Sequence, residues 1–269
     1  MSERLPSLRW ATGGLLLAGI LARLLGLARE MVIAHHYGLS DKIDAVYLGL
    51  ALPMAITLAC GGGLSTAIVP IAAALERSRL AGLLRLGTTR ILFLAAILAG
   101  LLGLTARWWT HLLVLGSGQP PSPTLVTTAT LACLAIVGGT LTGFMAGIVN
   151  AKGRHVTAAL NPLLYNSIVV LAVVFLHRPF GPISLMLGIV TAEWMQLCIL
   201  GPVAWKLSRS DEGRREAGIE WKSAAALFWP SATVALAIGL NTVVDRAFAE
   251  SLGDGAVTAL SYAERLVVL

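Results

Sequence analysis

The feature that most constrains this chain is a series of apolar runs, each about 20 residues long, separated by short polar segments. A run of this length crosses about 30 Å of hydrocarbon as an α-helix. The runs do not alternate between apolar and polar residues, which argues against a transmembrane β-barrel. Only 13% of the residues are charged, whereas a soluble domain has about 25%. The sequence therefore predicts an all-α polytopic membrane protein and excludes a soluble enzyme, a disordered tail and a disulfide scaffold.

Hydropathy predicts seven membrane spans and the start of an eighth. The second span is long and contains Pro53, Pro70 and three consecutive glycines, so we expect it to bend or break. The fourth contains glycines at 138, 139, 143 and 147, a spacing that lets neighbouring helices approach closely. The expected spans are 10–28, 44–75, 86–106, 124–150, 157–176, 182–206, 223–250 and 256–269.

The positions of Lys and Arg predict the orientation of the chain. One set of loops contains thirteen of these residues and the opposite set contains four. Cytoplasmic loops carry the excess of positive charge in membrane proteins, so we expect a cytoplasmic N-terminus. The basic residues are scattered in short loops with little aromatic interleaving, so the net charge of +6 does not indicate nucleic-acid binding.

The polar segment 207–222 marks the expected domain boundary, because it is the only sizeable polar stretch between the expected spans. We expect a first transmembrane lobe of six helices at 1–206, a cytoplasmic linker at 207–222, and the start of a second lobe at 223–269.

A pair of equal spacings crosses this boundary. Gly38 precedes Tyr47 by nine residues after the first span, and Gly253 precedes Tyr262 by nine residues after the seventh. Many transporters are built from internal repeats, and these spacings are consistent with one.

Ionisable residues within the spans are the candidate functional residues. A charge at the bilayer centre costs at least about 2.5–3.5 kcal/mol, so such residues usually face a protein interior or a water-filled cavity. Arginines outnumber lysines among them, and a guanidinium binds phosphate with two parallel hydrogen bonds, which indicates an anionic, phosphate-bearing ligand. The candidates are Arg23, Arg29, Glu30, Asp44, Glu193, Asp245, Arg246, Glu264 and Arg265.

Structural roles remain open for several of these residues. Arg23 and Glu30 are seven residues apart and share a helix face, so they can form an ion pair. Asp44 opens the second span, where an acidic residue suits the helix dipole. Asp245 and Arg246 are adjacent, and a local ion pair is the simpler interpretation for them.

The sequence does not indicate catalysis, a metal site or a cofactor. It contains no HExxH or GxSxG motif, and the glycines at 61–63 are not followed by the lysine of a phosphate-binding loop. His35 and His36 are adjacent, so their side chains diverge, and no Cys or Glu accompanies them at ligand spacing. The three cysteines lie in apolar stretches without a CxxC motif.

Four ordered segments between residues 22 and 266 share the pattern of a known family. Residues 22–30 (ARLLGLARE) are similar to its opening S-R-[VIL]-L-G-[FL]-x-R-[DE], and residues 37–53 contain its Y/F-G, D-A and L-P pairs. Residues 63–70 (GLSTAIVP) are similar to G-[AF]-[FL]-[ST]-x-A-F-[VI]-P, and residues 261–266 (SYAERL) to Y-[YA]-A-[DE]-R-[LI]. The chain thus resembles the MurJ/MviN family of the multidrug/oligosaccharidyl-lipid/polysaccharide (MOP) exporter superfamily.

The resemblance implies a lipid II flippase, which moves the undecaprenyl-diphosphate-linked peptidoglycan precursor across the bacterial cytoplasmic membrane by alternating access, for cell-wall biosynthesis. It implies that Arg23, Arg29 and Arg265 contact phosphate in a central cationic cavity. It also implies gating or ion-pair roles for Asp44 and Glu30. The expected partners are lipid II and membrane lipids, without nucleic acid, and no cofactor or metal is implied.

The chain departs from the family pattern in two places. Family members carry an arginine-rich stretch followed by A-E-G where this chain has the uncharged segment Thr57–Gly63, so a cavity arginine and a gate glutamate are missing. This leaves open a flippase for another polyprenyl-diphosphate-linked oligosaccharide, such as an exopolysaccharide or O-antigen precursor. The family fold has fourteen helices, and this chain stops in the eighth. We therefore expect a fragment or truncated product that does not transport by itself, or a half-protein that pairs with a partner chain.

Overall fold

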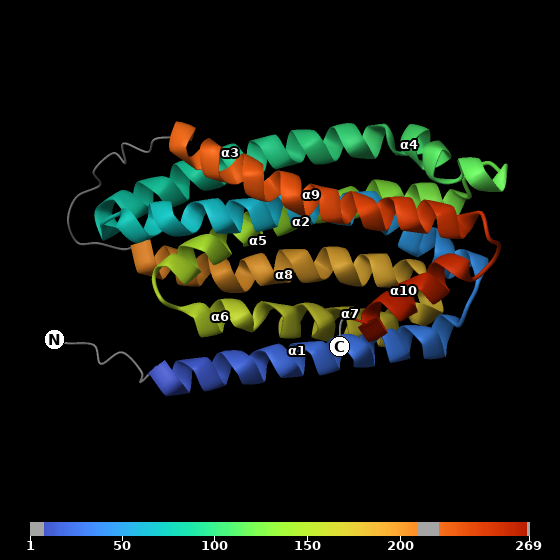
Figure 1. The fold of residues 1–269 in the computed structure, drawn as a ribbon, viewed down its shortest axis with the longest axis horizontal. Coiled ribbons are helices and arrows are strands. Elements are labelled where there is room, and N and C mark those ends of the chain that lie inside the picture. Colours follow the sequence, from blue (N-terminus) through green and yellow to red (C-terminus); the bar gives the residue numbers. More distant parts are fainter. Residues whose placement is uncertain (1–7, 209–220, 268–269) are drawn as a thin grey trace.

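The computed structural model describes residues 8–208 and 221–267, and in these ranges the chain is helical apart from short loops. The long helices lie side by side along one axis, and the loops gather at the two ends of the bundle (Figure 1). The helices are α1 (Leu8–Tyr37), α2 (Asp41–Ala74), α3 (Arg77–Leu104), α4 (Ala106–Leu113), α5 (Pro123–Ala151), α6 (His155–Ala159), α7 (Asn161–Phe180), α8 (Ile183–Ser208), α9 (Trp221–Glu250) and α10 (Ala256–Val267), with a 3-10 turn, η1, at Leu115–Ser117.

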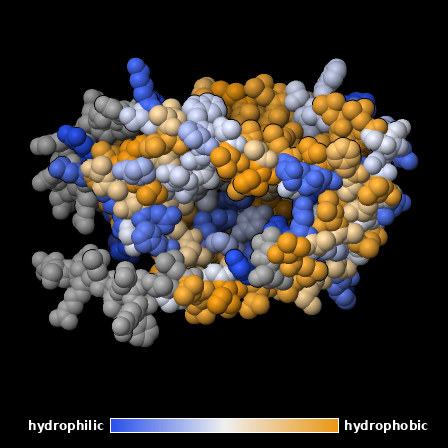
Figure 2. All heavy atoms as spheres, viewed as in Figure 1, coloured by the Kyte–Doolittle hydropathy of each residue, from blue (hydrophilic) through white to orange (hydrophobic). Residues whose placement is uncertain are grey.

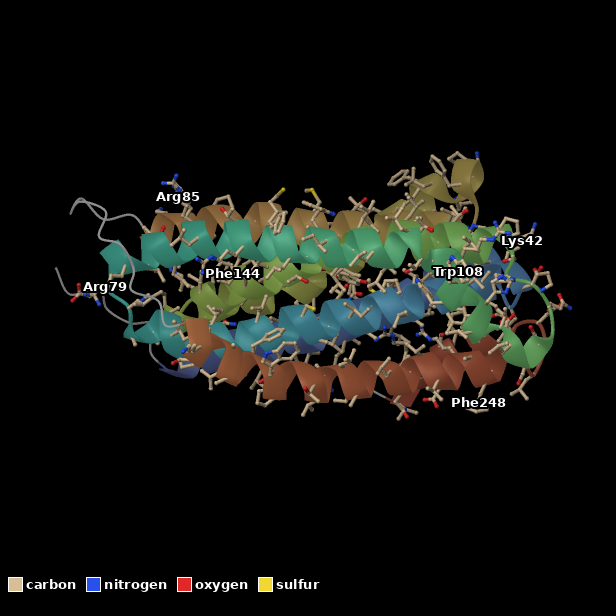
Figure 3. All side chains as sticks on the ribbon, turned by 90° about the horizontal axis from the view of Figure 1, so that it is seen from above. Lys42, Arg79, Arg85, Trp108, Phe144 and Phe248 are labelled. Carbon is tan, nitrogen blue, oxygen red and sulfur yellow. The ribbon has the colours of Figure 1, made fainter. Side chains whose placement is uncertain are left out.

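Six stretches of helix in the described residues are long and apolar enough to cross a membrane: α2, α3, α5, α6 with α7, α8 and α9. Large apolar side chains such as Phe93, Leu94 and Phe248 are mostly exposed, and Phe248 points away from the bundle (Figure 3). Exposed apolar surface on this scale suits contact with acyl chains rather than water. The protein is a multi-pass, all-α membrane protein.

Six of the eight expected spans correspond to these six stretches. The span expected at 10–28 lies within α1, and the one expected at 256–269 falls in α10, which has 12 residues; neither helix is among the six. The expected linker 207–222 lies mostly outside the described residues. The short amphipathic helix α4, which carries Trp108, and the turn η1 were not predicted.

The second span, expected to bend or break, does not break. Helix α2 is continuous for 34 residues and includes both Pro53 and Pro70. It packs against α5 and α9 over much of its length, and tertiary packing of this kind stabilises a helix despite unfavourable residues. The hydroxyl of Thr57 also donates a hydrogen bond of 2.8 Å to the Pro53 carbonyl.

The glycines of the fourth span have the packing role that the spacing predicted. A Cβ added to Gly61 of α2 would lie 2.7 Å from the carbonyl oxygen of Gly139 in α5. A Cβ added to Gly147 would lie 2.9 Å from the carbonyl oxygen of Ser65. On the other side of α5, a Cβ on Gly138 would lie 3.1 Å from Cβ of Glu193 in α8. Helix α5 is thus packed closely between α2 and α8.

The residues after the expected linker pack on the first six spans. Helix α9 lies along α2, and α10 turns back from the end of α9 to contact α2 and α1 (Figure 1). This arrangement brings residues near 30, 45, 166, 246 and 264 into one region of the bundle.

Candidate functional site

Arg29 and Glu30 lie at the centre of a buried polar cluster, although both are on α1 within a membrane-spanning bundle. Arg29 is 7% exposed and Glu30 is 6% exposed. The Arg29 guanidinium donates to Glu30 Oε1 through Nη2 at 2.5 Å and Nε at 3.2 Å. Its Nη1 donates to Oδ1 of Asn166 in α7 at 2.9 Å. Three of its nitrogens therefore have acceptors, which fixes the plane of the guanidinium.

Glu30 connects α1 with two other helices. Its Oε2 accepts a hydrogen bond of 2.8 Å from the hydroxyl of Tyr47 in α2. Its Oε1 lies 3.5 Å from Nε of Arg265 in α10, whose side chain is 52% exposed. Glu30 is therefore shared between a buried arginine and a half-exposed one. Figure 2 shows a hollow with hydrophilic residues in the middle of this face, between α1 and α9.

Arg246 of α9 joins the same region from the opposite side. Its Nη1 donates a hydrogen bond of 3.0 Å to the carbonyl of Tyr47, and its Nη2 lies 3.6 Å from Oε2 of Glu264. The prediction of a local ion pair between Asp245 and Arg246 was wrong. The Asp245 carboxylate instead accepts a hydrogen bond of 2.9 Å from the side-chain amide of Asn241. Neighbouring residues on a helix point about 100° apart, and α9 turns Arg246 inward while Asp245 stays exposed.

Asp44 is 2% exposed and its carboxylate binds the first turn of α10. It accepts hydrogen bonds from the backbone N–H of Gly255 at 2.6 Å and of Thr258 at 2.7 Å, and also from the Thr258 hydroxyl. The sequence left open a capping role for Asp44 on its own helix. The structure shows that it caps a helix more than 200 residues later in the chain.

The two glycine–tyrosine segments contact each other. Gly38 and Gly253 both have positive φ values, 59° and 108°, and each lies between two helices. The rings of Tyr47 and Tyr262 meet edge to face with centroids 6.3 Å apart, and the Tyr262 hydroxyl donates to the Gly38 carbonyl at 3.3 Å. Glycine adopts this backbone conformation without the strain of a Cβ.

Of the five residues to which the family resemblance assigns roles, four thus lie in or beside one cluster: Arg29, Glu30, Asp44 and Arg265. Arg23 is at an exposed position on α1, about 9 Å along the helix axis from Arg29. The sequence analysis missed Asn166, which carried no signal in the sequence, and it did not assign Tyr47 a role beyond the repeated spacing.

The histidine pair lies away from this cluster at the end of α1. His36 stacks on His177 of α7 with ring centroids 4.2 Å apart. Across residues 8–208 and 221–267, no three or more His, Cys, Asp or Glu side chains are grouped in a way that could hold a metal ion.

Two glycines of the uncharged segment Thr57–Gly63 pack closely against neighbouring helices. Besides the approach of Gly61 to α5, a Cβ added to Gly63 would lie 3.0 Å from Cβ of Ala232 in α9. Long charged side chains have no room at these two positions in this arrangement. The departure from the family pattern is therefore matched by a close contact of α2 with both neighbouring helices.

Comparisons with known proteins identify the family. The family model described as lipid II flippase MurJ matches residues 33–269. A lipid II flippase MurJ of Burkholderia cenocepacia is 26% identical over 265 residues, covering 92% of this chain and 51% of that protein. This chain therefore spans about half the length of the curated relative that it matches.

Solved structures share the fold. A lipid II flippase MurJ in an inward closed conformation superposes with a TM-score of 0.74 at 21% identity, covering 94% of this chain and 54% of that one. A MOP superfamily transporter from Pyrococcus furiosus superposes with a TM-score of 0.61 at 17% identity, covering 95% and 58% of the two chains. Because the family model covers most of the sequence and the fold agrees, this chain belongs to the lipid II flippase MurJ family.

Proposed function

We propose that this chain forms the first lobe and the start of the second lobe of a flippase that moves lipid II across the bacterial cytoplasmic membrane by alternating access. The remainder of the transporter lies either in the same polypeptide or in a partner chain. We further propose that the N-terminus is cytoplasmic, from the distribution of Lys and Arg, and that the protein carries out transport rather than a chemical reaction.

The observation that carries this proposal is the convergence of arginines from three helices on one region. Arg29 of α1, Arg246 of α9 and Arg265 of α10 surround two carboxylates, those of Glu30 and Glu264. Asp44 lies beside them with its carboxylate bound to the start of α10, so the cationic group open to an arriving ligand is the half-exposed Arg265. A diphosphate supplies the opposite charge, and guanidinium groups match its oxygen geometry.

The burial of each arginine suggests its role. Arg29 is held by three hydrogen bonds and is nearly inaccessible, so we assign it to orienting the site. Arg265 is half exposed and only 3.5 Å from its counter-ion, so we assign it to contacting phosphate. Arg23, exposed on the same helix as Arg29, extends the positive surface along α1.

Glu30 and Asp44 have roles in opening and closing under this proposal. An arriving phosphate competes with Glu30 for Arg265, so binding weakens one link between α1 and α10. Asp44 holds the N-terminus of α10 against α2, and release of this cap would allow the two lobes to separate. Alternating access requires such contacts to form in one state and break in another.

A second candidate is a flippase for another polyprenyl-diphosphate-linked oligosaccharide. The uncharged segment Thr57–Gly63 favours it, because that segment lacks the charges of typical family members. The arginine cluster would bind the diphosphate of either substrate, and the sugar would distinguish them.

Binding of lipid II to the purified full-length chain, measured by native mass spectrometry, tests this proposal. The variants Arg29→Lys and Arg265→Lys keep the charge but lose the two-pronged hydrogen-bonding group, so we expect about tenfold weaker binding from each. The matched control Arg178→Lys changes an exposed arginine at the end of α7 and should bind as the unmodified chain does. Equal binding by all three variants would overturn the role of the cluster. Stronger binding of a lipid-linked O-antigen precursor than of lipid II would select the second candidate.

A further inference from the structure

A cavity of about 750 Å³ lies between α3, α5 and α8, at the end of the bundle where α3 begins and α8 ends. It shares no lining residue with the polar cluster around Glu30. Its volume is within the range of about 300–1,000 Å³ that is typical of small-molecule sites. Figure 3 shows Arg85, which lines the cavity, extending outward at the same end as Arg79 and far from Lys42 and Trp108.

The rim of this cavity is positively charged. Arg85 of α3 and Lys206 of α8 both line it, and both are exposed. Neither forms an ion pair with a carboxylate in the part of the chain that the structure describes. In the sequence, Arg85 directly precedes the expected span 86–106 and Lys206 ends the expected span 182–206. Both cations are therefore at the same membrane boundary, at the depth of lipid headgroups.

Other lining residues at the rim suit this depth. Trp205 is 55% exposed beside Lys206, and tryptophan is enriched at the membrane–water interface because its ring is apolar and its N–H is polar. Thr88, one turn after Arg85, adds a hydroxyl to the lining. The rim thus offers two cations and neutral hydrogen-bonding groups.

The floor of the cavity is apolar and has unfilled space. Leu84 and Met145, which are 2% and 6% exposed, form part of it. Gly201 and Pro202 line it from α8. A Cβ added to Gly201 would meet no atom within 4 Å, so the glycine leaves room beside the helix. A ligand that fits has an anionic group at the rim and an apolar chain below it.

We propose that this cavity binds an anionic glycerophospholipid, with the lipid phosphate between Arg85 and Lys206 and the start of an acyl chain against Leu84 and Met145. Basic pockets between transmembrane helices on the side with excess positive charge are suited to such headgroups. Charge complementarity selects an anionic lipid over a zwitterionic one, because the two rim cations have no carboxylate partner among the described residues. The site does not depend on the proposed substrate, because it uses none of the residues assigned to lipid II.

Native mass spectrometry of the full chain, titrated with phosphatidylglycerol or phosphatidylcholine, tests the proposal. The unmodified chain should bind phosphatidylglycerol more tightly. The double variant Arg85→Gln/Lys206→Gln should bind it about tenfold more weakly while its binding of phosphatidylcholine is unchanged. The control Arg79→Gln/Arg154→Gln removes the same charge from exposed positions outside the cavity and should bind as the unmodified chain does.

A second variant separates the cavity from its charge. Gly201→Leu fills the open space without changing the charge, and it should also weaken phosphatidylglycerol binding. If the charge variant were to misfold, Gly201→Leu would still test the cavity. This variant should fold, because a Cβ at position 201 meets no atom within 4 Å.

Equal binding of the two lipids, or unchanged binding by both cavity variants, would overturn the proposal. An equal loss of binding in the control Arg79→Gln/Arg154→Gln would also overturn it. Displacement of the lipid by glycerol 3-phosphate would indicate a site for soluble phosphate and would contradict it as well. Displacement of phosphatidylglycerol by lipid II at equal concentration would instead assign the cavity to the transported substrate and likewise contradict it. Retained lipid II binding by Arg85→Gln/Lys206→Gln is expected.

Discussion

The carboxylate of Asp44 in α2 accepts hydrogen bonds from both the backbone N–H and the hydroxyl of Thr258 in α10. Helix α10 begins at Ala256, so this N–H is in its first turn and has no acceptor within the helix. A carboxylate there also interacts favourably with the helix dipole. Asp44 therefore stabilises the start of α10 and attaches it to α2 through one side chain.

Replacement of Asp44 by alanine should loosen α10. Hydrogen bonds to a charged group contribute about 1.5–3 kcal/mol each, and loss of a helix cap costs about 0.5–2 kcal/mol. A net loss of about 2 kcal/mol corresponds to a roughly 30-fold larger equilibrium constant for local opening, and exchange accelerates by the same factor. Hydrogen–deuterium exchange of peptides covering Ala256–Val267 measures this directly.

Two further variants make this test specific. Asp44→Asn keeps one acceptor oxygen and should have a smaller effect than Asp44→Ala. Asp41→Asn alters an exposed carboxylate in the same first turn of α2 and should leave exchange in α10 unchanged. Unchanged exchange in Asp44→Ala would show that other contacts hold α10 in place.

Glu30→Gln should lower the stability of the chain while strengthening its binding of anions. Glu30 is the counter-ion of Arg29 and lies within ion-pair distance of Arg265, and removal of one partner from a buried pair costs about 3–5 kcal/mol. The same change leaves Arg265 without a competitor for phosphate. We expect a lower thermal midpoint in detergent together with tighter lipid II binding in native mass spectrometry.

The contrasting variant Tyr47→Phe removes the hydrogen bond that the tyrosine hydroxyl donates to Glu30 and keeps the charge of Glu30. It should lower the midpoint slightly without strengthening binding. If Glu30→Gln bound lipid II more weakly than the unmodified chain, Glu30 would be a direct ligand of the substrate rather than a competitor.

The helices could be predicted from the sequence because each apolar run must satisfy its backbone hydrogen bonds internally in the membrane. The continuity of α2 could not be predicted, since it depends on α5 and α9, which pack along it and approach Gly61 and Gly63 respectively. The short helix α4 was also missed, because its eight residues are too few to cross a membrane and no proline marks its start.

The close approach of α2 and α5 should make Gly61 intolerant of a side chain. The Cβ of Gly61→Ala would lie 2.7 Å from the carbonyl oxygen of Gly139, and overpacking of this kind costs about 1–3 kcal/mol. The neighbouring variant Gly62→Ala is the matched control, because a Cβ there meets no atom within 4 Å. That variant should be neutral or stabilising by up to about 1 kcal/mol, since alanine favours the helix.

Thermal unfolding of both glycine variants in the same detergent compares them. The midpoint of Gly61→Ala should fall below that of the unmodified chain, and the midpoint of Gly62→Ala should equal or exceed it. Equal midpoints would mean that the two helices can shift apart without cost.

The polar cluster shows which parts of a site the sequence can reveal. Charges within spans are conspicuous because burying them is costly, and this drew attention to Arg29, Glu30 and Arg265. Their partners were not evident, because Asn166 and Tyr47 are ordinary residues in an apolar helix. Pairing between residues more than 200 positions apart, such as Glu30 with Arg265, depends on how α10 folds back onto α1.

The pair of Arg246 and Glu264 should be energetically coupled, whereas Arg246 and Asp245 should not. Arg246 lies 3.6 Å from Glu264 across α9 and α10, with side chains 12% and 34% exposed, and partly exposed pairs of this kind contribute up to about 1 kcal/mol. Asp245 is adjacent in sequence but binds Asn241. Double-mutant cycles of Arg246→Gln with Glu264→Gln and with Asp245→Asn, read by thermal or denaturant unfolding, separate the two cases. We expect a coupling energy of about 0.5–1 kcal/mol in the first cycle and one near zero in the second. A larger coupling to Asp245 would restore the local ion pair that the sequence suggested and would remove Arg246 as a link between α9 and α10.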